Sequence, residues 1–311
     1  MEIIETLING LSSGSTYAMI ALGYTMVYVI AKMLNFAHGD VIMVGGYTLH
    51  VVMSLMRQPV IAKVLAPVIE ANPVLGSLLV PLIGLLVAII FCTLLGITVE
   101  KVAYKPLRGA SPLAVLITAI GVSYLLQSAA QMIFGTAQKN VVVADLGNLQ
   151  IGPLKIQYHI LITLICSFVI MIALTIFIKK TKTGRAMIAV SEDRGAAQLM
   201  GINVNKIISI TFAIGSALAA FAGFFMLMKA PALQNTFGAM PGIKAFTAAV
   251  IGGIGSIPGA MLGGVLMGIV EAVTLKTPLA PYTDAIEFMI LIIILLVKPT
   301  GILGKVRREK V

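Results

Sequence analysis

The chain has 311 residues, of which 59% are hydrophobic and 11% are charged, and its formal net charge is +10. A soluble domain carries about 25% charged residues because its surface faces water, so this composition excludes an ordinary soluble protein and predicts one embedded in lipid. An excess of Lys and Arg is typical of the cytoplasmic loops of membrane proteins, and the chain has no basic and aromatic patch that would suggest a nucleic-acid partner.

Apolar runs recur along the whole sequence. A membrane-spanning helix needs about 20 mostly apolar residues. The predicted runs are Leu11–Ile30, Val41–Met56, Leu78–Val99, Leu113–Phe134, Ile160–Ile178, Ile207–Met228, Ala245–Val273 and Ala285–Val297. The predicted fold class is therefore all-α, a polytopic helical membrane protein with roughly eight to ten membrane segments in a single transmembrane domain, residues 1–311.

Basic residues predict the orientation of these runs. They gather between the third and fourth runs, between the fifth and sixth runs, and at the C-terminus, at Lys101, Lys105, Arg108, Lys179, Lys180, Lys182, Arg185, Arg194, Lys206, Lys305, Arg307, Arg308 and Lys310. Cytoplasmic loops are enriched in such residues, so all three regions are expected inside. The acidic N-terminus, Gln58–Ser77 and Gly135–His159 are then expected outside.

The seventh run, Ala245–Val273, is expected to be broken. Termini on opposite sides require an odd number of crossings, whereas eight runs give an even number. The run is also too long for one crossing, and Gly252–Gly259 interrupts it with four glycines and Pro258. Such a break in lipid must be buried in protein or line a cavity. The alternative is a simple loop within an over-long helix prediction.

A second interruption, Leu34–Asp40, separates the first two runs. It is either an ordinary turn with Asp40 as a helix cap or a non-helical element that lines a translocation path. Two interrupted segments in corresponding places also allow an inverted internal repeat, in which Leu11–Met56 would match Ile207–Val273.

The sequence does not favour catalysis. His38, His50 and His159 have no second ligand at metal-binding spacing, and no nucleotide-binding loop is present. We therefore predict no catalytic residues, no metal and no cofactor held by this chain. Among charges in apolar runs, Glu271 is the deepest, and either a transport role or an interfacial position is open to it. Lys244 and Glu287 lie near span ends and are further candidates, for which snorkelling to the interface is the alternative.

The polar segment 179–206 is predicted to be a cytoplasmic loop that holds a short helix. Ser191 is the expected cap, Glu192 and Asp193 fall in the first turn, and Gly201 suits the left-handed stop position. On a helix from Glu192 to about Met200, apolar side chains share one face and would form a ridge that fits a partner's groove. The alternative is a solvated helix lying on the membrane surface.

Three stretches resemble one protein family. Gly195–Gly201 resembles the E-A-A-x-x-x-G loop of bacterial ABC importer permeases, although Gly195 replaces the glutamate. Leu34–Asp40 resembles the L-N-F-A-H-G-D signature of branched-chain amino-acid permeases, and Val250–Ala260 resembles the glycine-rich stretch of the same family. Thr183–Ala186 followed by Asp193 also fits. The chain is thus similar to LivH-type permeases over nearly its whole length.

The resemblance implies a permease subunit in the bacterial inner membrane for leucine, isoleucine and valine. It implies a LivM-type second permease, two LivG/LivF-type cytoplasmic ATPases that hold ATP, and a periplasmic amino-acid-binding protein. The implied ATPase-coupling residues are Glu192, Asp193, Ala196, Ala197, Leu199, Met200 and Gly201. The expected path residues are Asn35, Phe36, His38, Gly39, Asp40, Gly252, Gly253, Gly255 and Gly259. Rival interpretations are an ABC permease for a sugar or another amino acid, an ion-coupled carrier and, more remotely, a membrane enzyme.

Overall fold

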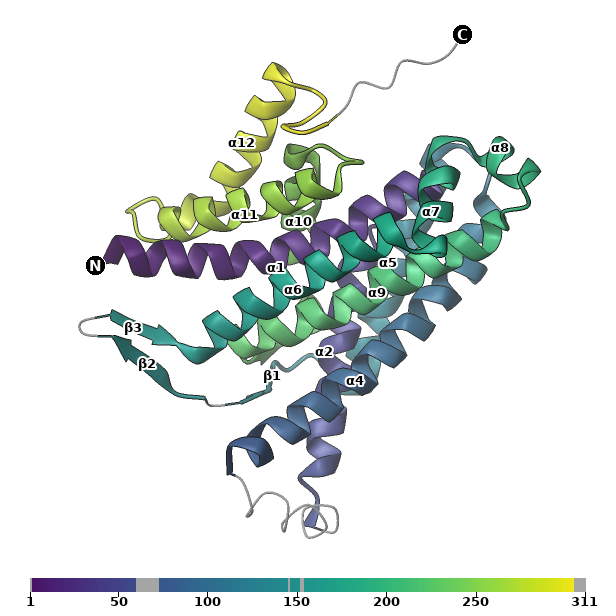
Figure 1. The fold of residues 1–311 in the computed structure, drawn as a ribbon. Helices are drawn as coiled ribbons and strands as arrows, with labels where there is room; N and C mark the ends of the chain where they lie inside the picture. Colours follow the sequence, from purple (N-terminus) through teal and green to yellow (C-terminus); the bar gives the residue numbers. More distant parts are fainter. Residues whose placement is uncertain (1, 60–72, 145, 152–153, 305–311) are drawn as a thin grey trace.

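The computed structural model describes residues 2–59, 73–144, 146–151 and 154–304, and this part of the chain is almost entirely helical (Figure 1). Its α-helices are α1 (Glu2–Ala31), α2 (His38–Met56), α4 (Pro73–Val99), α5 (Pro112–Phe134), α6 (Tyr158–Lys180), α7 (Lys182–Glu192), α8 (Arg194–Leu199), α9 (Val204–Lys229), α10 (Ala239–Gly252), α11 (Ile257–Thr274) and α12 (Thr283–Val297). A π-helix, Glu100–Tyr104, and a short 3-10 helix, Lys105–Leu107, continue α4, and a second 3-10 helix, Ala280–Tyr282, precedes α12.

Each predicted apolar run falls on a helix or, for Ala245–Val273, on two. Within the described residues, eight helices are long and apolar enough to cross a membrane. The additional helix α10 has 14 residues, which at about 1.5 Å each is too short for a hydrocarbon core of about 30 Å. The polytopic helical fold and the broken seventh run are therefore confirmed.

The helix α1 lies at the centre of the bundle. It packs against α6, α9, α10 and α11, and 89% of its most apolar 18-residue stretch is buried inside the protein. Small residues permit this packing, since a Cβ atom added to Gly14 would lie 2.8 Å from Cα of Val265 on α11. The corresponding stretches of α5 and α12 are only 17% and 11% buried, so these helices present apolar faces outward.

The two ends of α1 mark the two sides of the protein. At its N-terminal end, the amide of Lys155 donates to Glu5 over 3.3 Å. At its C-terminal end, Nη2 of Arg194 donates to the carbonyl oxygen of Ile30 over 3.0 Å, and Cβ built on Gly255 would lie 3.6 Å from Val29. The hairpin of β2 (Asn148–Ile151) and β3 (Leu154–Gln157) thus lies at the opposite end of the bundle from α7 and α8 (Figure 1), as the basic residues predict.

Two of the predicted loops lie wholly or partly outside the described residues. The basic C-terminal residues do, and so does most of Gln58–Ser77. Between Gly135 and His159 the structure contains a hairpin that the sequence does not predict, in which β2 (Asn148–Ile151) pairs antiparallel with β3 (Leu154–Gln157). A further two-residue pairing joins β1 (Lys139–Asn140) to β4 (Ala232–Leu233).

The break between α10 and α11 is closed by the segment that follows α12. The amides of Ile302 and Leu303 donate to the carbonyl oxygens of Ile251 and Gly252 over 2.8 and 2.9 Å. These carbonyls end a helix and would otherwise lack partners in an apolar surrounding. Gly253 has a φ of +103°, which a residue with a side chain rarely adopts, and this explains why glycine stands there.

Candidate functional site

The signature stretch Leu34–Asp40 joins α1 to α2 and is largely buried. The side chains of Asn35, His38 and Asp40 are exposed by 5%, 1% and 2%. The turn interpretation expected Asp40 to cap α2, and this expectation is wrong. The cap position belongs to Ala37, α2 begins at His38, and Asp40 lies in the first turn, where a carboxylate favours the positive end of the helix dipole.

Hydrogen bonds tie this stretch to α5 and to the π-helix. The hydroxyl of Tyr104 donates to Oδ1 of Asn35 over 2.7 Å, and Nε2 of Gln127 donates to Oδ1 of Asp40 over 2.8 Å. The ring of His38 packs edge-on against Tyr24, with 4.7 Å between ring centroids. The signature therefore joins α1, α2, α5 and the inner end of α4 in one buried polar contact set.

The signature also meets the start of α10. A Cβ atom on Gly39 would lie 2.6 Å from the carbonyl oxygen of Gly238, and the rings of Phe36 and Phe246 lie 5.6 Å apart. Asn35 of the first interruption and Ile254 of the second both line a cavity of about 10 Å³. The structure thus uses these glycines for close backbone contacts, and the path role of the two stretches stays a prediction.

A second polar cluster lies near the start of α9, at the end of the bundle where α1 ends. Glu100, which is fully buried at the start of the π-helix, forms an ion pair with Arg108 and accepts a hydrogen bond of 2.6 Å from Ser209. Arg108 also donates to Asn205 on α9. One cation here balances one carboxylate. Short π-helical turns often occur at functional sites, and this one places Glu100 and Tyr104 in the core together.

The polar segment 179–206, which we call the coupling segment after its predicted role, contains two helices where the sequence predicts one. Residues Lys182–Glu192 form α7, and α8 follows from Arg194 to Leu199. Ser191 is therefore not a cap, and its hydroxyl instead donates to the carbonyl of Ile188 over 2.6 Å. Asp193 caps α8, since its side chain accepts from the amide of Ala196 over 3.0 Å. The predicted start was wrong because Asp and Ser both suit a cap and only the backbone direction separates them.

The rest of the segment places its apolar residues outward. Leu199 and Met200 are 91% and 83% exposed, and Ala196 is also exposed, whereas Ala197 is buried. Gly201 has a φ of +81° and occupies the predicted left-handed stop position. Leu199 and Met200 thus form the exposed apolar ridge that the sequence predicts on this helix.

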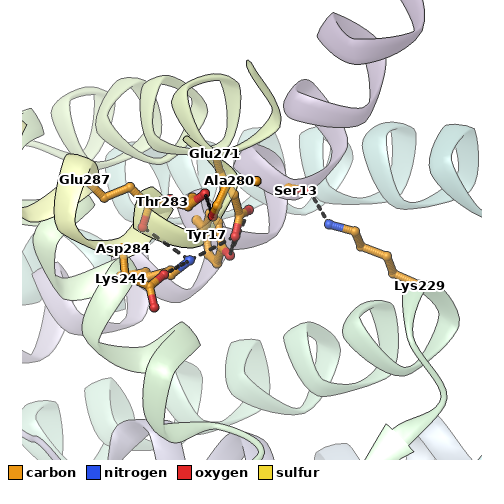
Figure 2. A network of polar contacts seen from close by, with 9 residues as sticks. All are labelled: Ser13, Tyr17, Lys229, Lys244, Glu271, Ala280, Thr283, Asp284 and Glu287. Atoms are coloured by element: carbon orange, nitrogen blue, oxygen red, sulfur yellow. Dashed lines mark hydrogen bonds and ion pairs between the residues drawn. The ribbon is translucent and has the colours of Figure 1, made fainter. Parts of the chain in front are cut away.

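An ion cluster near α12, buried except for Asp284, is the feature that sequence reasoning missed. Nζ of Lys244 lies 2.9 Å from Glu271, 2.8 Å from Asp284 and 3.3 Å from Glu287 (Figure 2). The hydroxyl of Tyr17 on α1 lies 3.0 Å from both carboxylate oxygens of Glu271.

Lys244 and Glu287 therefore do not snorkel. Lys244 is 7% exposed and Glu287 is fully buried. Each lies near a helix end in the sequence, which suggested an interfacial position, but α10 is short and buried, so its first turns lie inside the protein. The signal available in the sequence was one lysine and three acids within or next to the last two apolar runs, where charges are costly unless they pair.

Comparisons with known proteins assign a family. The family model described as "Branched-chain amino acid transport system / permease component" matches residues 6–295. The chain is 42% identical over 99% of its length to the high-affinity branched-chain amino acid transport permease BraD of Pseudomonas aeruginosa, covering 98% of that protein. It is also 42% identical over 100% of its length to LivH of Escherichia coli, with 98% of that protein covered. The ribose import permease RbsC of Haemophilus influenzae is 26% identical over 94% of the chain and 84% of that protein.

Proposed function

The chain belongs to the family of branched-chain amino acid transport permease components, and from this premise we propose that it forms the membrane path of an ATP-driven importer for leucine, isoleucine and valine. It is a multi-pass permease of the inner membrane and a transport subunit, not an enzyme. The observation that carries the substrate class is the 42% identity over nearly full length to two permeases for branched-chain amino acids. The ribose permease reaches 26%.

The partners are the finer part of the proposal. A LivM-type permease would complete the membrane path, two LivG/LivF-type ATPases would hold and hydrolyse ATP, and a periplasmic protein would deliver the amino acid. The exposed Leu199 and Met200 support an ATPase contact, because water-exposed apolar side chains on a short helix fit a groove in another protein.

The position of α8 supports a coupling mechanism. Closure of the ATPases would move α8, which lies between α7 and α9 in the chain, and α6 and α9 would tilt as rigid bodies. Arg194 also connects α8 to the last turn of α1 through the carbonyl of Ile30. The signature begins a few residues beyond that turn, so movement of α8 would reach the buried contacts at Asn35 and Asp40.

Reconstituted transport tests this function. The chain is placed in liposomes with the second permease, the two ATPases and the binding protein, and uptake of radiolabelled leucine and ribose is measured. We expect leucine uptake that requires both ATP and the binding protein. Ribose uptake under the same conditions would replace the amino-acid assignment. Leucine uptake by the chain alone, driven by an ion gradient, would establish an ion-coupled carrier instead.

A further inference from the structure

A cavity of about 170 Å³ lies between α1, α6 and α9. This is several times the roughly 30 Å³ that one water occupies in the liquid, so it has room for a small solute. Ser12, Ser13, Thr16, Tyr17, Thr163, Phe225, Met226, Lys229, Ala230 and Phe237 line it. We call it the outer pocket, because it lies in the half of α1 that carries the N-terminus.

One wall of the outer pocket is cationic. Nζ of Lys229, in the last turn of α9, donates to Oγ of Ser13 over 2.7 Å (Figure 2). A lysine ammonium has three donors, so one hydrogen bond to Ser13 leaves further donors for a carboxylate. The neighbouring hydroxyls of Ser12 and Thr163 add polar groups beside that charge.

The next turn of α1 faces the ion cluster, in which the carboxylates of Glu271, Asp284 and Glu287 share the one cation of Lys244. Tyr17 also lines the pocket, and its hydroxyl lies 3.0 Å from both carboxylate oxygens of Glu271. The phenol oxygen that donates to this carboxylate can still accept a hydrogen bond from a cationic group. Ser13 and Tyr17 are four residues apart on one face of α1, so their Cα atoms are about 6 Å apart along the helix axis.

Apolar side chains complete the pocket. Phe225 is buried, and Met226 and Phe237 are half-buried beside it. The pocket therefore offers a cation, a hydroxyl backed by an anion, and an apolar wall. This set matches the carboxylate, the ammonium group and the hydrocarbon side chain of an apolar α-amino acid, since each group finds a partner of opposite charge or like polarity.

We propose that the outer pocket is an amino-acid subsite of the permease, with the substrate carboxylate on Lys229, its ammonium group against Tyr17, and its side chain against Phe225 and Phe237. This proposal rests on the proposed transport function and adds a contact site to it. The pocket opens in the outer half of the bundle, where an amino acid released by a binding protein would enter.

Binding measurements on the assembled transporter, without the binding protein, test the subsite. In the Lys229→Met variant we expect the affinity for radiolabelled leucine to fall about tenfold to a hundredfold, because a hydrogen bond to a charged group is lost. Lys229→Arg keeps the cation and should restore most of the affinity. The matched control is Lys276→Met, which removes an exposed lysine from the connection after α11. The α-keto acid of leucine, which lacks the ammonium group, should bind more weakly than leucine.

A labelling experiment gives a second reading of the same pocket. Leucine should slow the reaction of a small thiol reagent with Ser12→Cys, and should not slow its reaction with Ser54→Cys, an exposed site on α2. Equal leucine affinity in Lys229→Met and the unmodified complex, or no protection of Ser12→Cys, would overturn the subsite.

The two proposals fail in different ways. If the unmodified complex imports leucine and Lys229→Met imports it with the same KM, the subsite is wrong and the transport function stands. If the unmodified complex imports no leucine, the transport function is wrong, and leucine protection of Ser12→Cys still decides whether the pocket binds an amino acid.

Discussion

The signature stretch Leu34–Asp40 and the part of the coupling segment from Asp193 to Gly201 use their residues in opposite ways. In the signature, Asn35, His38 and Asp40 are buried and bonded or packed against three other helices. In the coupling segment, Leu199 and Met200 are almost fully exposed. A change in the signature should therefore damage the fold, whereas a change in the coupling segment should damage assembly with another chain.

The largest effect is expected for Gly39→Val. Its side chain would collide with the backbone of Gly238, because a Cβ atom alone would lie 2.6 Å from that carbonyl oxygen. We expect a loss of stability of about 3 kcal/mol or more, seen as lost yield and a lowered Tm in detergent. Gly121→Val on α5 is the matched control, since its Cβ meets nothing within 4 Å. Equal Tm values for the two variants would contradict the buried contact.

The Leu199→Asp substitution should break the other half of the comparison. We expect lost co-purification of the ATPases with normal membrane insertion and Tm, because a charge replaces the most exposed apolar side chain of the segment. Leu279→Asp provides a control of the same chemistry, since Leu279 is 53% exposed at the opposite end of the protein. Ala197→Asp is less suitable, because Ala197 is buried and its replacement would also disturb local packing. Intact ATPase binding by Leu199→Asp would remove the coupling role.

Buried charges should behave like the signature. Lys244→Met leaves Glu271, Asp284 and Glu287 without their shared cation, so the free energy of unfolding should fall by about 3–5 kcal/mol. Glu287→Gln keeps the cation and should cost about 1 kcal/mol or less, since Oε1 of Glu287 has no hydrogen-bond partner within the described residues. Thermal unfolding of both variants measures the difference. Similar losses would mean that Lys244 is not the centre of the cluster.

A smaller effect than that of Gly39→Val or Lys244→Met is expected for Tyr104→Phe. It removes the hydrogen bond of 2.7 Å to Asn35 and leaves that buried oxygen without its donor. We expect a loss of about 1–2 kcal/mol. Tyr124→Phe, at a tyrosine that is 66% exposed on α5, should leave the Tm unchanged. Equal Tm values for Tyr104→Phe and Tyr124→Phe would mean that the hydrogen bond between Tyr104 and Asn35 does not stabilise the fold.

The sequence predicts the parts of this fold that depend on lipid. Apolar length locates the spans, and the parity of basic loops requires the break between α10 and α11. It cannot separate Ser191 from Asp193 as a cap, because both are good caps and the choice depends on where α7 ends. It also misplaces Lys244, since a lysine near a helix start resembles an interfacial residue until the depth of that start is known. The sequence also could not predict that Ser13 and Tyr17 line one pocket, because this depends on how α1 packs against α6 and α9.

The bond between Arg194 and Ile30 gives α1 a mechanical meaning. A helix is stiff along its axis, and the 13 residues from Ile30 back to Tyr17 span about 20 Å. The single helix α1 therefore contacts the coupling segment at its C-terminal end and lines the outer pocket with its N-terminal half. A small axial displacement applied by α8 would arrive at Ser13 and Tyr17 with little loss, and it would shift Tyr17 relative to Lys229, which belongs to a different helix. The distance between Lys229 and Tyr17 would then change with the axial position of α1.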